Sequence, residues 1–324
     1  MSRFIRRSLP VALLLVAGKA AAIDFITLDF QGDMSDIERQ TFVDAAAYWN
    51  SVITGFKAPY FYENDGVTVA TAPPTLTITA SLPAIDDIGG TLGQAGPMTA
   101  RYADNDNLTP HPTYSRYYVS TGFMEFDVAD VAAMISANTF YGVVLHEMGH
   151  VLGIGTMWDF NTTSEGIVGN PIYRAADPSV TDNDQPVGAY TGQYALAKWI
   201  AEFDRTGATF VPVEKGGGAG TANGHWNEFD GGGIGIGPVS NLTGLDLSQE
   251  LMTGWASDVF FVSEMTLGSL EDLGFEVDYS KAGIVDHVVV VPEPIAWIPA
   301  GLAGVLLTAG LKRRQNARYR PRFR

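Results

Sequence analysis

One short segment, HEMGH at residues 146–150, constrains this chain more than any other feature. An apolar run leads into it, and together they predict a helix over residues 138–153. On that helix His146 and His150 lie one turn apart on the same face, where two imidazoles can bind a single Zn²⁺ at ~2.0–2.1 Å. Glu147 is not a ligand in this arrangement, but its carboxylate can take a proton from water beside the metal. The segment therefore predicts metal-assisted hydrolysis rather than two unrelated structural histidines.

A catalytic zinc ion needs a third protein ligand and an open fourth position. The chain continues to Gly153, which completes the pattern H-E-x-x-H-x-x-G and suits the left-handed position that ends a helix. A short signature of this kind would carry its third histidine at the position of Thr156. The third ligand must then come from elsewhere. The candidates are the remaining histidines and two downstream carboxylates: His225, His111, His287, Glu165 and Glu202.

The motifs around His225 single it out from the other candidates. In chain order they are VPVE at 211–214, Trp226 directly after the histidine, ELM at 250–252 and LGSLEDLG at 267–274. Placed after H-E-x-x-H-x-x-G and a long insertion, this order resembles the leishmanolysin family of metzincin zinc proteases. The similarity extends over roughly residues 115–280.

The resemblance implies a role for each of these residues. The zinc ligands would be His146, His150 and His225. Glu147 would be the general base and acid, and Met252 would lie in the turn beneath the metal. The chain departs from the family in two ways. It has no cysteine for disulfides or for a cysteine-based latency switch, and its body of about 270 residues leaves no room for a large C-terminal domain.

We expect an α+β fold of the zincin, metzincin-like type, with one subdomain at 23–155 that carries the zinc helix and a second at 156–285 that carries the third ligand and the Met turn. The first should hold a twisted mixed sheet above a cleft, and the second should be irregular and close the cleft from below. Ser35 and Glu38 form a capping-box signature at a helix start. Hydrophobic periodicity predicts strands at 23–30, 75–82 and 116–127, and further helices at 35–54, 191–204, 246–252 and 262–273.

A peptide substrate would lie along an edge strand of the upper sheet as an added strand. Our candidate for this rim is the segment 91–101. Its substrate-binding residues would be Gly93, Gln94, Ala95, Gly96 and Pro97.

Composition narrows the possible partners and reactions. Between residues 23 and 294 the chain has 36 acidic and nine basic residues, which leaves a formal charge of −27, so nucleic acid is not expected as a partner. The absence of cysteine excludes a thiol nucleophile and cysteine-bound zinc, and no G-x-S-x-G elbow supports a serine hydrolase. Acidic loops at 102–107 and 177–184 could supply oxygen ligands to Ca²⁺, although solvated loops are the simpler interpretation.

Both ends of the chain have the composition of export signals. Residues 1–22 combine a basic start, a short apolar run and small residues, which is typical of a secretory signal peptide rather than a buried N-terminal helix. Near the other end the charge-free run 295–311 is just long enough for a membrane helix and is followed by a basic cluster. With Pro-Glu-Pro at 292–294, the segment 286–324 resembles the PEP-CTERM sorting signal of Gram-negative bacteria, which an exosortase is thought to process. A simple membrane anchor is the alternative.

We therefore predict an exported zinc endopeptidase at the cell surface, in the extracellular matrix or secreted. One alternative is a surface adhesion protein that keeps zinc without turnover, and another is a metal-dependent hydrolase of a different substrate. Glu147 argues against the adhesion protein, because a structural zinc site gains nothing from a general base beside it.

Overall fold

The computed structural model describes residues 24–63, 68–105, 116–158, 188–216, 220–228 and 237–286, with the backbone of three two-residue strands between 173 and 186. The expected signal peptide and sorting tail, most of the loop at 177–184, the end of the loop at 102–107, and His111, Glu165 and His287 lie outside these residues. Within the described part of the chain, every helix is too short or too polar to cross a membrane.

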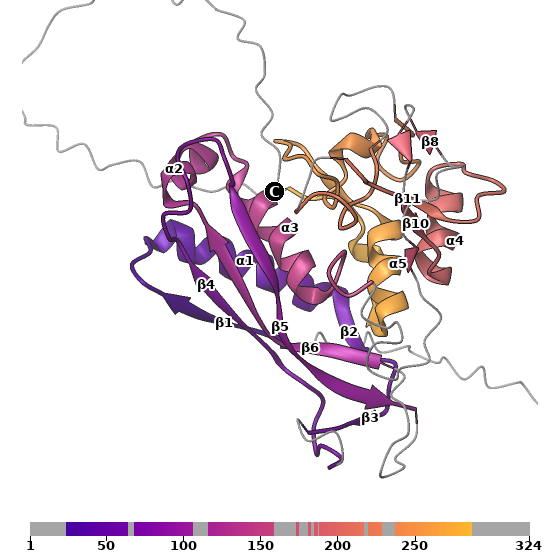
Figure 1. Ribbon diagram of the computed structural model, residues 1–324, viewed down its shortest axis with the longest axis horizontal. Helices are drawn as coiled ribbons and strands as arrows, with labels where there is room; N and C mark the ends of the chain where they lie inside the picture. Colours follow the sequence, from indigo (N-terminus) through magenta and orange to yellow (C-terminus); the bar gives the residue numbers. More distant parts are fainter. Residues whose placement is uncertain are drawn as a thin grey trace, which may run out of the picture.

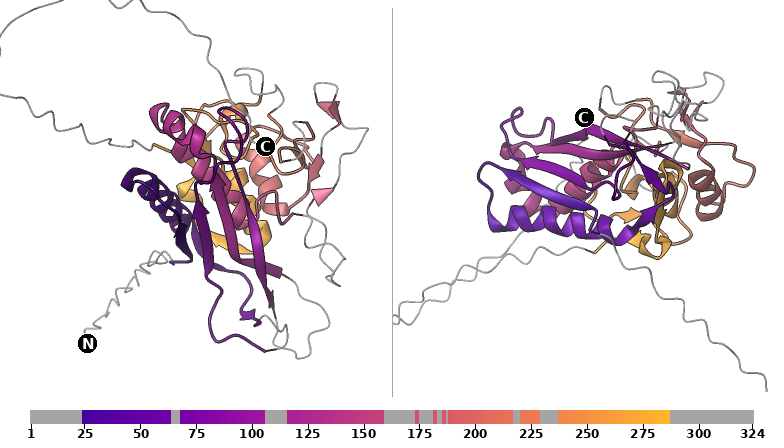
Figure 2. Two further views of the ribbon diagram at one scale, coloured as in Figure 1. Left: turned by 60° about the vertical axis from the view of Figure 1, so that its left-hand side comes forward. Right: turned by 90° about the horizontal axis from the view of Figure 1, so that it is seen from below.

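The N-terminal part forms a curled, mixed five-stranded sheet (Figure 1, Figure 2). The first three strands in sheet order run parallel, and the last two are antiparallel to their neighbours. In sheet order they are β1 (Ile26–Gln31), β4 (Leu76–Ser81), β6 (Arg116–Phe126), β5 (Gly93–Asp104) and β3 (Tyr60–Phe61). This confirms the α+β class and the strands expected at 23–30, 75–82 and 116–127.

Two helices cover one face of this sheet. α1 (Asp36–Val52) begins at the predicted capping box, in which Glu38 N donates to Ser35 Oγ and Ser35 N donates to Glu38 Oε2. α3 (Phe140–Leu152) is buried along its whole length and packs against α1, β5 and β6. It ends at Gly153, whose φ of 114° is the left-handed conformation that favours glycine. The helices expected at 35–54 and 138–153 are confirmed.

The helix α2 (Val128–Ser136) was not expected from the sequence. It follows β6 directly, and its N-cap is Asp127, whose side chain accepts from Ala129 N at 2.9 Å. Asp127 also fits the alternating pattern of the preceding strand, so it was assigned to the end of the strand expected at 116–127 and not to the start of a helix.

The second part of the chain consists of short elements joined by loops. α4 (Gln193–Glu202) and α5 (Glu264–Leu273) pack against each other and confirm the helices expected at 191–204 and 262–273. β13 (Phe275–Val277) pairs with β2 (Ile53–Phe56), so the chain returns to the first part before residue 286. The remaining short strands are β7 (Tyr173–Arg174), β8 (Thr181–Asp182), β9 (Gln185–Pro186), β10 (Gly188–Tyr190), β11 (Val211–Val213), β12 (Phe261–Val262) and β14 (Gly283–Ile284).

The helix expected at 246–252 is wrong. Only Leu247–Gln249 form a single 3₁₀ turn, and a second short 3₁₀ turn spans Tyr279–Lys281. After the first turn, Glu250 has an extended backbone and its side chain accepts from Met252 N at 2.6 Å. Side-chain capping of this kind competes with helical hydrogen bonds, so the apolar spacing of 246–252 does not produce a helix.

Candidate active site

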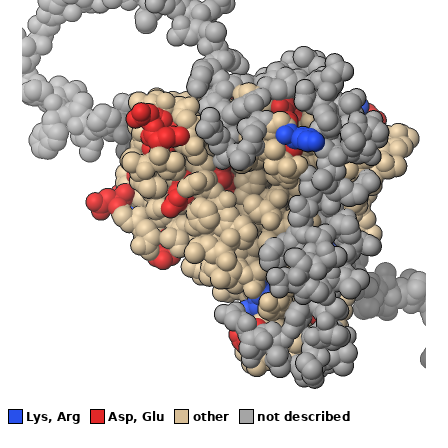
Figure 3. All heavy atoms as spheres, viewed as in Figure 1, with Lys and Arg blue, Asp and Glu red and all other residues tan. Residues whose placement is uncertain are grey.

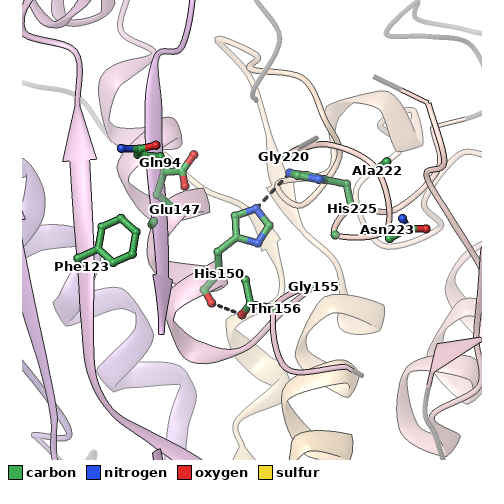
Figure 4. A pocket seen from close by; sticks show the side chains of 12 residues that line it. Gln94, Phe123, Glu147, His150, Gly155, Thr156, Gly220, Ala222, Asn223 and His225 are labelled. Carbon is green, nitrogen blue, oxygen red and sulfur yellow. Dashed lines mark hydrogen bonds between the residues drawn. The ribbon is translucent and has the colours of Figure 1, made fainter. Parts of the chain in front are cut away.

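Three histidine side chains from distant parts of the sequence converge in the structure. His146 and His150 lie on α3, whereas His225 follows β11 in the second part of the chain. Their Nε2 atoms form a triangle with sides of 2.9 Å from His146 to His150, 3.0 Å from His146 to His225 and 3.1 Å from His150 to His225. All three side chains are buried. Figure 4 shows His150 facing His225 across the pocket.

The opposite nitrogen of each ring bonds a backbone carbonyl. The Nδ1 distances are 2.6 Å from His146 to Leu251 O, 2.8 Å from His150 to Ile154 O and 2.8 Å from His225 to Thr221 O. A carbonyl oxygen only accepts, so each Nδ1 carries the hydrogen and each Nε2 presents a lone pair. Three lone pairs that point at one another are stable together only around a shared cation.

This donor set fits a zinc ion. Nitrogen atoms that bind a tetrahedral zinc at ~2.0–2.1 Å lie roughly 3.3 Å apart, close to the sides of the observed triangle. Three neutral imidazoles are a common ligand set for catalytic zinc and leave a fourth position open. The backbone carbonyls behind the rings fix both the tautomer and the ring orientation. His146, His150 and His225 can therefore hold the metal together.

Burial keeps the three imidazoles neutral. It lowers the pKa of His150 to about 4, and burial together with the neighbouring His150 lowers the pKa of His225 to about 3. Burial and the two other rings hold the pKa of His146 well below its usual value. Because only the neutral imidazole has a free nitrogen for a metal, the group stays competent to bind well below neutral pH.

β11 and the turn that contains Met252 hold His225 from two sides. Glu214 N donates to His225 O at 2.8 Å, and the neighbouring Trp226 N donates to Met252 O at 3.0 Å. The Trp226 ring is buried and stacks on Trp158, with ring centroids 4.8 Å apart. The VPVE motif, the His-Trp pair and the ELM motif are therefore parts of one hydrogen-bonded layer.

Two glycines allow this layer to approach α3. A Cβ atom on Gly149 would lie 2.9 Å from Met252 Sδ, so the methionine packs directly against α3. Gly155 has a φ of +75°, and a Cβ atom there would overlap the backbone of Gly224, the residue before His225. The role of Gly155 was not predicted from the sequence, although its position two residues after Gly153 was a usable signal.

Glu147 lies beside the histidines on the wall of a cleft of about 420 Å³. The side chain is buried, and burial raises the pKa of its carboxyl to about 8. Gln94 of β5 lines the same cleft (Figure 4). The cleft is lined by Gln94, Ala95, Phe123, Glu147, His150, Gly155, Thr156, Gly220, Ala222, Asn223, Gly224 and His225.

The substrate rim expected at 91–101 corresponds to the N-terminal half of β5. Of its five candidate residues, Gln94 and Ala95 line the cleft, whereas Gly93, Gly96 and Pro97 do not. Gly93 also packs closely against the neighbouring strand, because a Cβ atom there would lie 2.7 Å from the Phe126 ring.

Glu202, the carboxylate alternative within the described residues, is not part of the histidine group. Its two oxygens accept from Ser240 Oγ at 2.7 Å and from Glu264 N at 2.8 Å, between α4 and α5. The carboxylate thus joins these two helices and does not face the histidines.

A buried carboxylate that was not predicted from the sequence shapes the Met turn. Glu250 accepts four hydrogen bonds: from Met252 N at 2.6 Å, Ser263 N at 3.1 Å, Ser263 Oγ at 2.8 Å and Thr266 Oγ1 at 2.5 Å. This fixes the turn in which Leu251 O accepts from His146. The position of Glu250 two residues before Met252 was visible in the ELM motif, but its burial was not.

Comparison with known families agrees with this geometry. The sequence profile of the leishmanolysin peptidases matches residues 113–288, which are more than half of the chain. The matched part contains α3, the three histidines and the Met turn. No curated protein matches the sequence. The chain therefore belongs to the leishmanolysin family (peptidase M8) and is a metallopeptidase by family.

Proposed function

We propose that the protein is a zinc-dependent endopeptidase in which His146, His150 and His225 bind the metal and Glu147 is the general base. The observation that carries the proposal is the triangle of three Nε2 atoms. Each Nε2 has a free lone pair because the ring hydrogen is on Nδ1. The triangle lies beside the buried carboxyl of Glu147 in an open cleft. A zinc ion held there supplies Lewis acidity, which polarises a scissile carbonyl and acidifies water.

Glu147 would move the proton during hydrolysis. As a carboxylate it can take a proton from the attacking water, and burial, which raises the pKa of this carboxyl, favours the protonated form that results. The protonated side chain can then pass the proton to the leaving amine. The residue thus acts as base in the first step and as acid in the second.

The edge of β5 would hold the substrate backbone. Asp127 N donates to Leu92 O, so alternation of the antiparallel ladder directs the backbone groups of Gly93 and Ala95 away from β6. β3 pairs with β5 only at Tyr60–Phe61, which leaves this edge unpaired among the described residues. A peptide that adds as a strand here would lie across the cleft above α3.

The ends of the chain support export as part of the proposal. Residues 1–22 would direct secretion, and the tail at 286–324 would be processed by an exosortase-type enzyme or would anchor the body by a membrane helix. The protein would then act at the cell surface, in the extracellular matrix or as a secreted enzyme, with peptides and not nucleic acid as substrates.

A peptide-library digest tests the function. Wild type should cleave peptides, and removing zinc with a chelator should stop cleavage until zinc is restored. The Glu147→Ala variant should keep one zinc per chain but lose cleavage by roughly 100-fold or more, since proton transfer by a positioned group contributes ~10²–10⁴-fold. A variant that digests as fast as wild type would refute the assigned mechanism, and a zinc-loaded wild type without cleavage would favour the adhesion protein.

A further inference from the structure

A second group of acidic side chains lies away from the histidine cleft, at the end of the sheet where α2 begins. Asp86 belongs to the loop between β4 and β5, Asp127 is the N-cap of α2, and Asp130 lies in the first turn of that helix. One carboxylate oxygen of each residue lies within 4.8 Å of the others. Figure 3 shows acidic atoms gathered at the α2 end of this face, with no basic atoms beside them in its described part.

These three carboxylates have no basic partner in the part of the chain that the structure describes. Asp127 and Asp130 are buried, and Asp86 is exposed. Among the described residues, no lysine, arginine or histidine forms an ion pair with any of them, and Arg101, the sole lysine or arginine between 58 and 115, pairs with Glu63. Buried carboxylates are normally paired with an opposite charge or a metal, and no charge partner for this cluster lies among the described residues.

The hydrogen bonds of the cluster leave one buried oxygen free. Asp127 accepts from Ala129 N at 2.9 Å and from Asp86 N at 2.7 Å. Asp130 Oδ1 accepts from Gly89 N at 2.9 Å. Asp130 Oδ2 is buried and accepts no hydrogen bond from the described residues, although the side chain is only 4% exposed. An oxygen in this position requires a ligand of positive charge or a donor.

We propose that Asp86, Asp127 and Asp130 bind one Ca²⁺ ion. Calcium takes six to eight oxygen ligands at ~2.3–2.6 Å, so its ligand oxygens lie up to ~5 Å apart, and three carboxylate oxygens within 4.8 Å of one another can reach one ion. Each oxygen that already accepts a hydrogen bond keeps a second lone pair for the metal. This site differs from the acidic loops at 102–107 and 177–184 considered from the sequence.

The bound ion would fix the loop that leads into the cleft edge. The same carboxylates already hold Asp86 N and Gly89 N, and the loop continues through Leu92 to Gly93, where β5 begins. Calcium would therefore stabilise the start of the strand that carries Gln94 and Ala95. Calcium binding itself does not depend on the proposed peptidase function, whereas an effect on substrate binding would.

Calorimetric titration and thermal unfolding of the zinc-loaded full chain test the site. Wild type should bind one Ca²⁺ per chain in this region, and its melting temperature should rise with Ca²⁺ more than with the same concentration of Mg²⁺. Asp130→Asn, which keeps an acceptor for Gly89 N, should weaken Ca²⁺ binding at least tenfold. Asp86→Asn, at an exposed position where misfolding is not expected, should weaken it in the same direction.

The matched control is Asp258→Asn, an exposed carboxylate outside the cluster, which should bind Ca²⁺ like wild type. No Ca²⁺-dependent stabilisation of wild type would overturn the proposal. It would also be overturned if both cluster variants bound Ca²⁺ as tightly as wild type, or if Mg²⁺ stabilised the protein equally. Zinc content is measured in every sample, so the result stands whether or not the protein cleaves peptides.

Discussion

The two parts of the molecule contribute to the candidate metal centre in different ways. The N-terminal part supplies His146, Glu147 and His150 from one fully buried helix that packs on α1 and the sheet. The second part supplies His225 from a loop that is fixed by single hydrogen bonds, a close glycine contact and the buried carboxylate of Glu250. The comparison indicates that packing positions the first two ligands and that a small number of polar contacts position the third.

The largest expected effect compares one ligand from each part. His150→Ala and His225→Ala should each lower zinc affinity by more than the ~10–100-fold typical of losing an outer hydrogen-bond partner of a ligand, because each removes one of three donors. Peptide cleavage should fall to background in both. Zinc titration with a competing chelator measures the affinities. If His225→Ala bound zinc as tightly as wild type, the second part of the chain would not contribute a ligand to the metal site.

Glu250→Ala should be the most damaging change outside the ligands. It leaves the donors of Met252, Ser263 and Thr266 buried without their acceptor, and we expect a loss of roughly 3 kcal/mol in the free energy of unfolding. Zinc affinity should fall by ~10–100-fold, since Leu251 O would no longer be held against His146.

The matched control for this change is Glu38→Ala in the exposed capping box of α1, where denaturant unfolding should give a loss near ~1 kcal/mol and unchanged zinc affinity. If Glu250→Ala and Glu38→Ala lost equal zinc affinity, the contacts of Glu250 would not position the metal site in the way proposed.

Comparing Gly155→Ala with Gly207→Ala should distinguish the effect of a steric overlap from the effect of a positive φ alone. Gly155 and Gly207 both have positive φ, but a Cβ atom on Gly207 meets nothing within 4 Å, whereas one on Gly155 would overlap Gly224. Gly207→Ala should cost about 1 kcal/mol of stability and leave zinc binding intact. Gly155→Ala should cost about 2–3 kcal/mol and weaken zinc binding, because the loop of His225 must move. Identical behaviour of the two variants would show that the loop tolerates the added atom.

The smallest effect concerns Glu202, which lies between α4 and α5. Burial raises the pKa of this carboxyl to about 7, so the folded protein holds the proton while the unfolded chain ionises near 4.5. The stability that Glu202 contributes is thus complete below pH 4.5 and is lost as the pH rises through 7. Relative to Glu202→Gln, wild type should lose on the order of 2 kcal/mol between pH 4.5 and 8 in denaturant unfolding. Zinc content should be equal in both proteins.

The regular elements of the fold were predictable because their apolar positions repeat with the period of a helix or a strand. α1, α3, α4 and α5 and the strands β1, β4 and β6 follow such patterns. α2 was not predicted because its N-cap residue, Asp127, also fits the alternating pattern of β6. The turn at 250–252 was not predicted because its conformation depends on the Glu250 carboxylate. The hydrogen-bond partners of that carboxylate, Ser263 and Thr266, are distant in sequence.

The convergence of the histidines could be expected only in part. The spacing of His146 and His150 places them on one helical face, but nothing in local periodicity brings His225 to them. Its selection rested on the order of motifs shared with a family, and the structure adds the contacts that explain it, namely β11, the Met turn and Gly155 against Gly224. The aspartates at 86, 127 and 130 gave no sequence signal because their proximity depends on the β4–β5 loop.

X-ray absorption at the zinc edge of the purified wild-type protein tests the central claim most directly. Three imidazole nitrogens and one further oxygen at ~2.0–2.1 Å are expected, and His225→Ala should lower the number of imidazoles to two. A wild-type spectrum with only two imidazoles, or one unchanged by removal of His225, would contradict the account.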